Sequence, residues 1–111
     1  MVDICAGIGT HALVASDLCL CPVGLFDKDQ EALQAAAVIR REFLPSRVMD
    51  FHDRRHWWTV AQCGAAWWGM SPPCQDYCGS GTHKSLNGER GWTSLEILLG
   101  IVLCGPKGFC I

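Results

Sequence analysis

Cys74 directly follows two prolines, Pro72 and Pro73, which come after the apolar run 65–69. The prolines fix φ near about −65° and remove two backbone donors, so the chain cannot continue a strand ladder or begin a helix before the cysteine. The apolar run predicts a short buried strand, and ligands of open α/β sheets bind beyond the carboxyl ends of strands. We therefore predict that Cys74 is presented as a nucleophile, the alternative being an inert buried thiol.

A second group of residues near the start of the chain is typical of nucleoside binding. Gly7 and Gly9 follow a short apolar strand, where the lack of Cβ atoms lets the backbone approach a ligand such as a methionine carboxylate. Asp27 ends the next expected strand, where nucleoside binders place an acid on ribose hydroxyls. The alternative for the two glycines is a tight turn that binds no ligand. The alternative for Asp27 is an acid that caps the next helix, although this role fits Asp29 better.

Six short segments occur along the chain in a fixed order. They are 3–10, 26–29 followed by Ala32, 49–51, 72–75, 88–90 and 105–111. In this order they resemble the amino-terminal half of cytosine-C5 methyltransferases, the family that methylates carbon 5 of cytosine in nucleic acid with S-adenosylmethionine. Cys5 departs from the family, which usually has phenylalanine at that position of the glycine motif.

The resemblance implies S-adenosylmethionine as the cofactor. It places ten residues in the cofactor site: Asp3, Cys5, Ala6, Gly7, Gly9, Asp27, Lys28, Asp50, Phe51 and Pro72. Asp50 would accept a hydrogen bond from the adenine amino group, Phe51 would lie beside the ring, and Asp3 would support the glycine turn. Cys74 would attack C6 of a flipped-out cytosine, and Arg90 would orient the base or its phosphate. A surface-turn aspartate and a solvated arginine are the alternatives for Asp50 and Arg90.

The spacing of apolar and turn residues predicts alternating strands and helices. Strands are expected at 2–5, 22–26, 46–49, 65–69 and 109–111, and helices at 10–20, 30–43 and 92–104, while 52–61 is open to a short helix. This alternation predicts an α/β fold with a Rossmann-like, mostly parallel sheet flanked by helices. The resemblance implies the methyltransferase strand order 3-2-1-4-5, with the fifth strand as an exposed edge. We expect residues 70–91 to form a long loop, which Gly79 and Gly81 would let close over a substrate.

The length of 111 residues predicts a single domain, with a cofactor-binding half at 1–60 and a catalytic loop with its following helix at 61–111. The resembled family continues into a Glu-Asn-Val motif whose glutamate contacts N3 of cytosine, and this sequence does not contain it. We therefore expect a partial catalytic domain in which methyl transfer is impaired.

Composition and charge bear on partners and location. A net charge of −2 lacks the basic footprint of an autonomous nucleic-acid binder, so DNA, preferred here over RNA, is a substrate implied by the resemblance alone. Eight cysteines without a visible secretory segment indicate reduced intracellular thiols, in the nucleus of a eukaryote or the cytoplasm of a prokaryote. The longest apolar stretch, 95–104, is about half a membrane span, so no membrane association is expected.

Two other functions remain open from the sequence. One is a cofactor-binding pseudoenzyme or interaction module without turnover. The other is a metal-binding protein, for which Cys19, Cys21, Cys74, Cys78 and four histidines offer ligands. Zinc sites prefer Cys-x-x-Cys or Cys/His knuckles, which this spacing does not provide, so we predict no metal.

Overall fold

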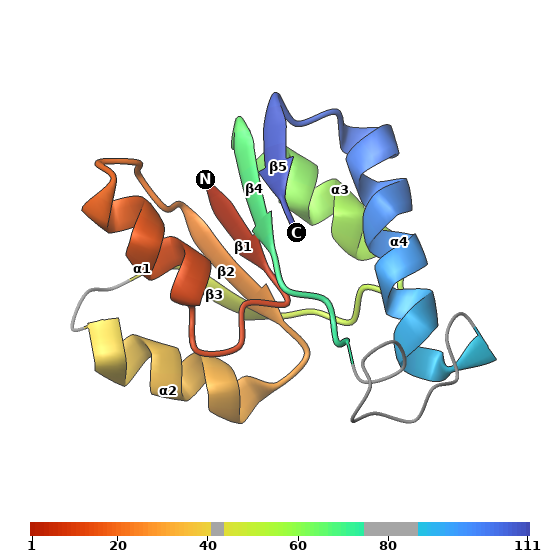
Figure 1. Cartoon of the computed structure of the whole chain (residues 1–111), viewed down its shortest axis with the longest axis horizontal. Coiled ribbons are helices and arrows are strands. Elements are labelled where there is room, and N and C mark those ends of the chain that lie inside the picture. The colour runs from red at the N-terminus through yellow and green to blue at the C-terminus, as the bar shows by residue number, and fades with distance from the viewer. Residues whose placement is uncertain (41–43, 75–86) are drawn as a thin grey trace.

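The structure is a computed structural model of the chain that describes residues 1–40, 44–74 and 87–111. In these residues, strands and helices alternate along the sequence (Figure 1). The strands are β1 (Val2–Ile4), β2 (Gly24–Asp27), β3 (Ser46–Val48), β4 (Trp67–Met70) and β5 (Gly108–Cys110). The helices are α1 (Thr10–Asp17), α2 (Gln30–Arg40), α3 (Arg55–Gln62) and α4 (Glu89–Cys104).

The five strands form one sheet in the order β3-β2-β1-β4-β5, and every pairing is parallel. Helices α1 and α2 cover one face of the sheet, and α3 and α4 cover the other (Figure 1). The predictions of an α/β fold and of the order 3-2-1-4-5 are confirmed. Because all strands are parallel, their carboxyl ends meet at one edge of the sheet, where the connecting segments gather.

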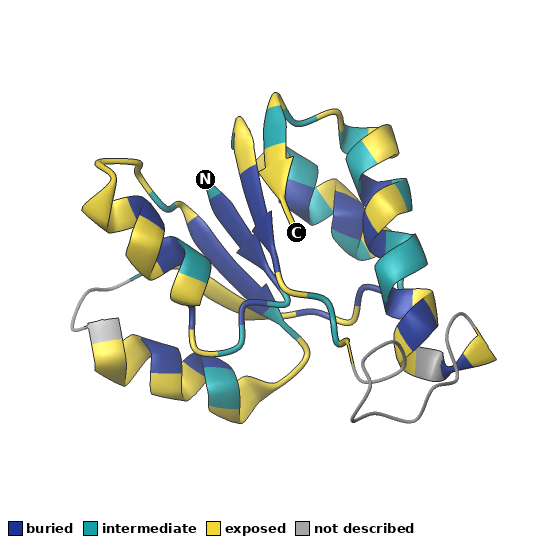
Figure 2. Cartoon of the chain, viewed as in Figure 1, coloured by how far each residue is buried: buried dark blue, intermediate teal, exposed yellow. Residues whose placement is uncertain are grey.

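The central strands are buried on both faces, while the edge strands β3 and β5 are largely exposed (Figure 2). Val2 and Ile4 of β1 point into the larger core cluster under α3 and α4, which also contains Trp57 and Trp68. The alternation of side chains along a strand sends Asp3 to the opposite face, toward α1. A fully buried carboxylate in the central strand therefore needs partners on α1.

Helix α1 ends at Asp17, before the predicted end at residue 20. The chain turns into the left-handed region at Cys19, whose φ is 60°. There the N–H of Cys19 donates to the Ser16 carbonyl at 3.0 Å, and the N–H of Leu20 donates to the Ala15 carbonyl at 2.8 Å. This pair of bonds closes a helix end in the way that glycine usually allows.

Other boundaries differ by a few residues from the sequence prediction. Helix α4 begins at Glu89, ahead of the predicted start at 92. The prediction missed this first turn because its residues lack the apolar periodicity that indicates a helix. Strand β2 begins at Gly24 rather than 22, and Met70, expected in the loop, is the last residue of β4 and lies opposite Ile4. The segment 52–61 forms a helix from Arg55 onward. None of the helices within the described ranges is long and apolar enough to cross a membrane.

Helices α3 and α4 pack closely through one glycine. A Cβ added at Gly100 would lie 2.4 to 2.6 Å from three ring atoms of Trp57. That ring cannot move aside, because it stacks on Trp68 at a centroid distance of 6.0 Å and touches Phe51 at 4.8 Å. The aromatic group of Phe51, Trp57 and Trp68 thus connects α4 to the end of β3.

We predict that Gly100→Ala lowers the free energy of unfolding by about 2 kcal/mol, since overpacking against a fixed ring outweighs the gain of about 1 kcal/mol in helix propensity. Urea denaturation followed by circular dichroism measures this change. The matched substitution Val102→Ala, at a side chain that is 79% exposed, should cost less than about 0.5 kcal/mol. A Gly100→Ala protein as stable as the wild type would contradict the packing described.

Candidate functional site

A cavity of about 540 Å³ opens where the carboxyl ends of β1, β2, β3 and β4 meet the first turn of α4. This volume lies within the range of ligand pockets. Eight of the residues predicted for the site line it: Cys5, Ala6, Gly7, Asp27, Lys28, Asp50, Phe51 and Arg90. Residues far apart in the sequence therefore share one cavity at the edge where open α/β sheets bind ligands.

The glycine turn after β1 has a backbone that favours glycine. Gly7 has φ of 52° and Gly9 has φ of 79°, both in the left-handed region. Gly7 lines the cavity, and a Cβ at this position would meet no atom within 4 Å, so no side chain fills the space beside the turn. Cys5 also has φ of 52°, and a left-handed conformation is uncommon for a residue with a side chain.

Two carboxylates hold this turn from different sides. Asp27 at the end of β2 accepts the N–H of Gly7 through Oδ2 at 2.7 Å and the N–H of Asp29 through Oδ1 at 2.9 Å. Asp3 of β1 accepts the N–H of Ala12 through Oδ2 at 3.1 Å. Because Gly9, the N-cap of α1, has no side chain to offer, the buried Asp3 carboxylate serves the first turn of the helix in its place.

The ionisable groups beneath the turn are perturbed by burial. Burial raises the pKa of Asp3, while the Ala12 N–H and the His11 ring act in the opposite direction. Burial, together with the nearby Asp27 carboxylate, raises the pKa of the Cys5 thiol to about 12. The Cys5 thiol on the cavity wall is therefore harder to deprotonate than an ordinary cysteine, which makes it a poor nucleophile.

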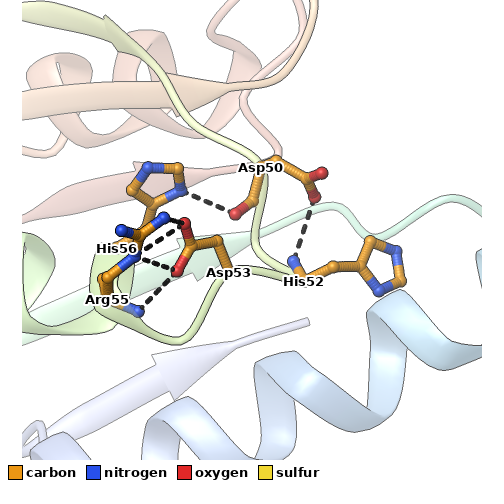
Figure 3. A network of polar contacts seen from close by, with 5 residues as sticks. All are labelled: Asp50, His52, Asp53, Arg55 and His56. Carbon is orange, nitrogen blue, oxygen red and sulfur yellow. Dashed lines mark hydrogen bonds and ion pairs between the residues drawn. The ribbon is translucent and has the colours of Figure 1, made fainter.

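The other end of the cavity combines an apolar ring with a carboxylate. Phe51 is 3% exposed, and its ring is supported by Trp57. Beside it, Asp50 accepts the N–H of His52 through Oδ1 at 3.0 Å, and its backbone carbonyl lies 2.6 Å from Nδ1 of His56 (Figure 3). No donor among the described residues contacts Asp50 Oδ2, so this oxygen can accept a hydrogen bond from a ligand.

Helix α4 is tied to the segment that carries Asp50. Nε2 of His52 lies 2.9 Å from the hydroxyl of the buried Thr93. Arg54 pairs with Glu96 one helical turn further along, at 3.5 Å. These contacts place the first turn of α4, with the exposed Arg90, on the wall of the cavity.

Four of the predicted site residues do not line the cavity. Asp3 and Gly9 are buried behind the glycine turn and hold it in place. Pro73, rather than Pro72, contributes to the cavity wall. Cys74 is exposed and follows Pro73 immediately, outside the lining.

Several predictions fall on residues that the structure does not describe. Gln75, Cys78, Gly79 and Gly81 lie outside the described residues, as does most of the predicted loop.

The capping role of Asp29 is confirmed, because its Oδ1 accepts the N–H groups of Glu31 and Ala32 at 2.9 and 3.1 Å.

The sequence prediction missed other residues that line the cavity: Ile8, Thr10, Asp29, Met49, His52, Ser71, Pro73 and Thr93. Ser71 and His52 could have been found, because each follows a strand end by one or a few residues. Thr93 had no such signal, since its approach to His52 depends on how α4 packs against α3.

The seven cysteines in the described part of the chain are unpaired. Within the same residues, no three His, Cys, Asp or Glu side chains come together as a metal site would require.

Comparison with models of known protein families gave no match, and comparison with curated protein sequences also gave none. A functional interpretation therefore depends on the geometry of the cavity and on the resemblance of the motifs.

The segment that follows Asp50 contains a carboxylate, Asp53, whose hydrogen bonds to Arg55 can be tested through the pH dependence of stability. Its carboxylate accepts hydrogen bonds from the side chain and the N–H of Arg55, and these bonds lower the pKa of Asp53 from 3.8 to about 2 (Figure 3). A lowered native pKa stabilises the fold above pH 3.8, and this contribution is lost as the pH falls toward about 2. We predict that Asp53→Asn makes the free energy of unfolding less dependent on pH in this window.

Urea denaturation at a series of acidic pH values measures this dependence. Asp17→Asn, at the exposed end of α1, is the matched control and should leave the slope unchanged. An identical slope in the wild type and in Asp53→Asn would show that the Asp53–Arg55 pair does not contribute.

Proposed function

We propose that this protein binds S-adenosylmethionine in the cavity and transfers its methyl group to C5 of cytosine in DNA through an adduct with Cys74. One observation carries the proposal. Successive strands β3, β2 and β1 deliver Asp50, Asp27 and the glycine turn, in that order, to a single cavity. This is the order in which an extended adenosyl amino acid would need an adenine acceptor, a ribose acceptor and a turn with no side chain in the way.

The dimensions and surface of the cavity fit such a ligand. Two strand spacings separate the end of β3 from the end of β1, about 10 Å along the edge. Phe51 offers a supported apolar ring at the adenine end, and Asp50 Oδ2 is available to the adenine amino group. Asp27 uses one lone pair on each oxygen for the turn, which leaves further acceptor capacity for ribose hydroxyls.

The charge of the cavity favours a sulfonium nucleoside over a dinucleotide. In dinucleotide-binding folds the glycine turn receives a pyrophosphate. Here the N–H of Gly7 is already bonded to the Asp27 carboxylate, so a phosphate would meet a negative charge. The carboxylates of Asp27, Asp29 and Asp50 on the lining outnumber the cations of Lys28 and Arg90, which suits a cationic ligand.

The chemistry proposed for Cys74 is nucleophilic addition. Its thiolate would form a bond to C6 of cytosine, which moves electron density to C5. When bound, S-adenosylmethionine supplies the electrophilic methyl group that C5 then takes up. Loss of the C5 proton to a base and cleavage of the S–C6 bond would restore the aromatic ring and the thiolate. Because the cytosine must leave the DNA stack to be attacked at C6, an exposed thiol at the rim suits this step.

A cofactor-binding module without turnover is the second candidate. The observation that favours it is the position of Cys74 outside the lining of the cavity. Binding and covalent trapping separate the two functions, because only the enzyme does both.

We predict that the full chain binds S-adenosylhomocysteine, and that Asp50→Ala weakens this binding about tenfold, because a charged hydrogen-bond acceptor for the adenine amino group is lost. Isothermal titration calorimetry measures the dissociation constants. S-inosylhomocysteine, which lacks the amino group, should bind the wild type and Asp50→Ala equally. Equal weakening of both ligands would contradict the role given to Asp50, and no binding of either ligand to the wild type would contradict the proposed cofactor.

From the proposed methyltransferase activity we also predict that the protein forms a covalent adduct with DNA that contains 5-fluorocytosine. After methyl transfer, fluorine at C5 cannot leave as a proton does, so the S–C6 bond persists. Each trapped molecule needs only one transfer, so the adduct accumulates even when methyl transfer is as slow as the sequence leads us to expect. Denaturing gel electrophoresis with S-adenosylmethionine present should show a shifted band that Cys74→Ser abolishes. Cys63→Ser, at another exposed cysteine, should keep the band. Cofactor binding without any adduct would favour the binding module.

A further inference from the structure

Ser71 is a cavity residue to which the proposed function gives no role. It is the first residue after β4, and its N–H donates to the Ile4 carbonyl of β1 at 3.1 Å, which fixes its backbone at the carboxyl edge of the sheet. Ser71 lines the cavity, and its side chain reaches toward α1, where its hydroxyl oxygen is 3.3 Å from Nδ1 of His11. Only Pro72 and Pro73 separate Ser71 from Cys74 in the sequence.

The same nitrogen of His11 also faces a buried carboxylate. Nδ1 lies 3.3 Å from Oδ1 of Asp3, which is fully buried, while the His11 side chain is 28% exposed. An ionised carboxylate only accepts hydrogen bonds, so Asp3 selects the form of His11 that carries a proton on Nδ1. That N–H can be shared between Asp3 Oδ1 and Ser71 Oγ. The Ser71 oxygen then acts as an acceptor, and its own proton remains to be donated elsewhere.

A small residue on β4 makes this arrangement possible. A Cβ at Gly69 would lie 2.8 Å from Cβ and 3.0 Å from Cγ of His11. The position therefore has to be glycine for the imidazole to lie against β4 and reach Ser71. Asp3, His11 and Ser71 come from β1, α1 and the residue after β4, so their contacts link the helix after the glycine turn to the segment that leads to Cys74.

The place of Ser71 along the sheet edge indicates which part of a ligand it would meet. Strand β4 is three strand spacings from β3, about 14 Å from the adenine end marked by Asp50. Asp27 and the glycine turn lie between them. The donor hydroxyl therefore lies at the end of the cavity farthest from the adenine, where the amino-acid part of an adenosyl amino acid would extend.

We propose that Asp3, His11 and Ser71 form a relay in which His11 orients the Ser71 hydroxyl as a donor to the α-carboxylate of an amino-acid-bearing nucleoside. This inference rests on the proposed function, because it needs a nucleoside in the cavity. Ser71 is the binding residue, and His11 and Asp3 are positioning residues. Since Gly7 gives its N–H to Asp27, the anionic group of the ligand needs a donor of this kind from another element.

Two probes separate the relay from nucleoside binding in general. S-adenosylhomocysteine carries the α-carboxylate, and 5′-methylthioadenosine has the same nucleoside without the amino acid. With the full chain in isothermal titration calorimetry, Ser71→Ala should weaken S-adenosylhomocysteine about tenfold and leave 5′-methylthioadenosine unchanged. Ser46→Ala, at the start of β3 and remote from the relay, should change neither.

The role of His11 is tested by two amides of different length. In Asn the amide nitrogen is the same number of bonds from Cα as Nδ1 is in His, whereas in Gln it is one bond further. His11→Asn should therefore retain the preference for S-adenosylhomocysteine over 5′-methylthioadenosine, and His11→Gln should lose it as Ser71→Ala does. Circular dichroism of each variant shows whether the fold is kept, and the ratio of the two affinities is insensitive to a partly unfolded fraction.

Each outcome decides a separate point. Selective loss in Ser71→Ala with rescue by His11→Asn supports the relay. If the wild type binds both nucleosides and Ser71→Ala weakens both equally or neither, the relay is overturned while the proposed cofactor stands. If the wild type binds neither nucleoside, the proposed function fails and this inference fails with it.

Discussion

The cavity depends on two carboxylates that hold one glycine turn. Asp27 reaches across from β2 to the N–H of Gly7, and Asp3 reaches up from β1 to the N–H of Ala12. The left-handed backbone at Gly7 and Gly9 gives the turn its shape, but glycine can also adopt many other backbone conformations at little free-energy cost. The carboxylates select one conformation, in which Gly7 lines the cavity with open space beside it.

These carboxylates have different burial, and this difference divides their roles. Asp3 is fully buried and acts only on the protein, through α1 and His11, whereas Asp27 lies at the cavity and retains acceptor capacity for a ligand. Asp50 is exposed at the far end, over the apolar support that Phe51 receives from Trp57. The sheet thus presents acceptors of increasing exposure from its buried centre toward β3. This arrangement supports the proposal of a cationic nucleoside ligand.

Much of the fold could be predicted from the sequence because its signals are local. The turn-forming glycines and prolines, the apolar strands and the Asp29 cap identified the elements that the structure describes except α3, which the sequence left open. The alternation of strands and helices led to the parallel sheet. The end of α1 could not be predicted, because Cys19 takes a left-handed position that sequence rules give to glycine. The contact of His11 with Ser71 joins residues 60 positions apart and has no signature in either segment. Such pairings follow from the register of β1 and β4, which only the folded sheet establishes.

A crystal structure of the chain with S-adenosylhomocysteine would show whether the cavity is a nucleoside site. We expect the adenine ring against Phe51 with its amino group on Asp50, the ribose on Asp27, and the bond between Gly7 and Asp27 intact. A ligand bound elsewhere, or bound in the reversed orientation with its adenine beside Ser71, would show that the cavity does not bind a nucleoside in this way.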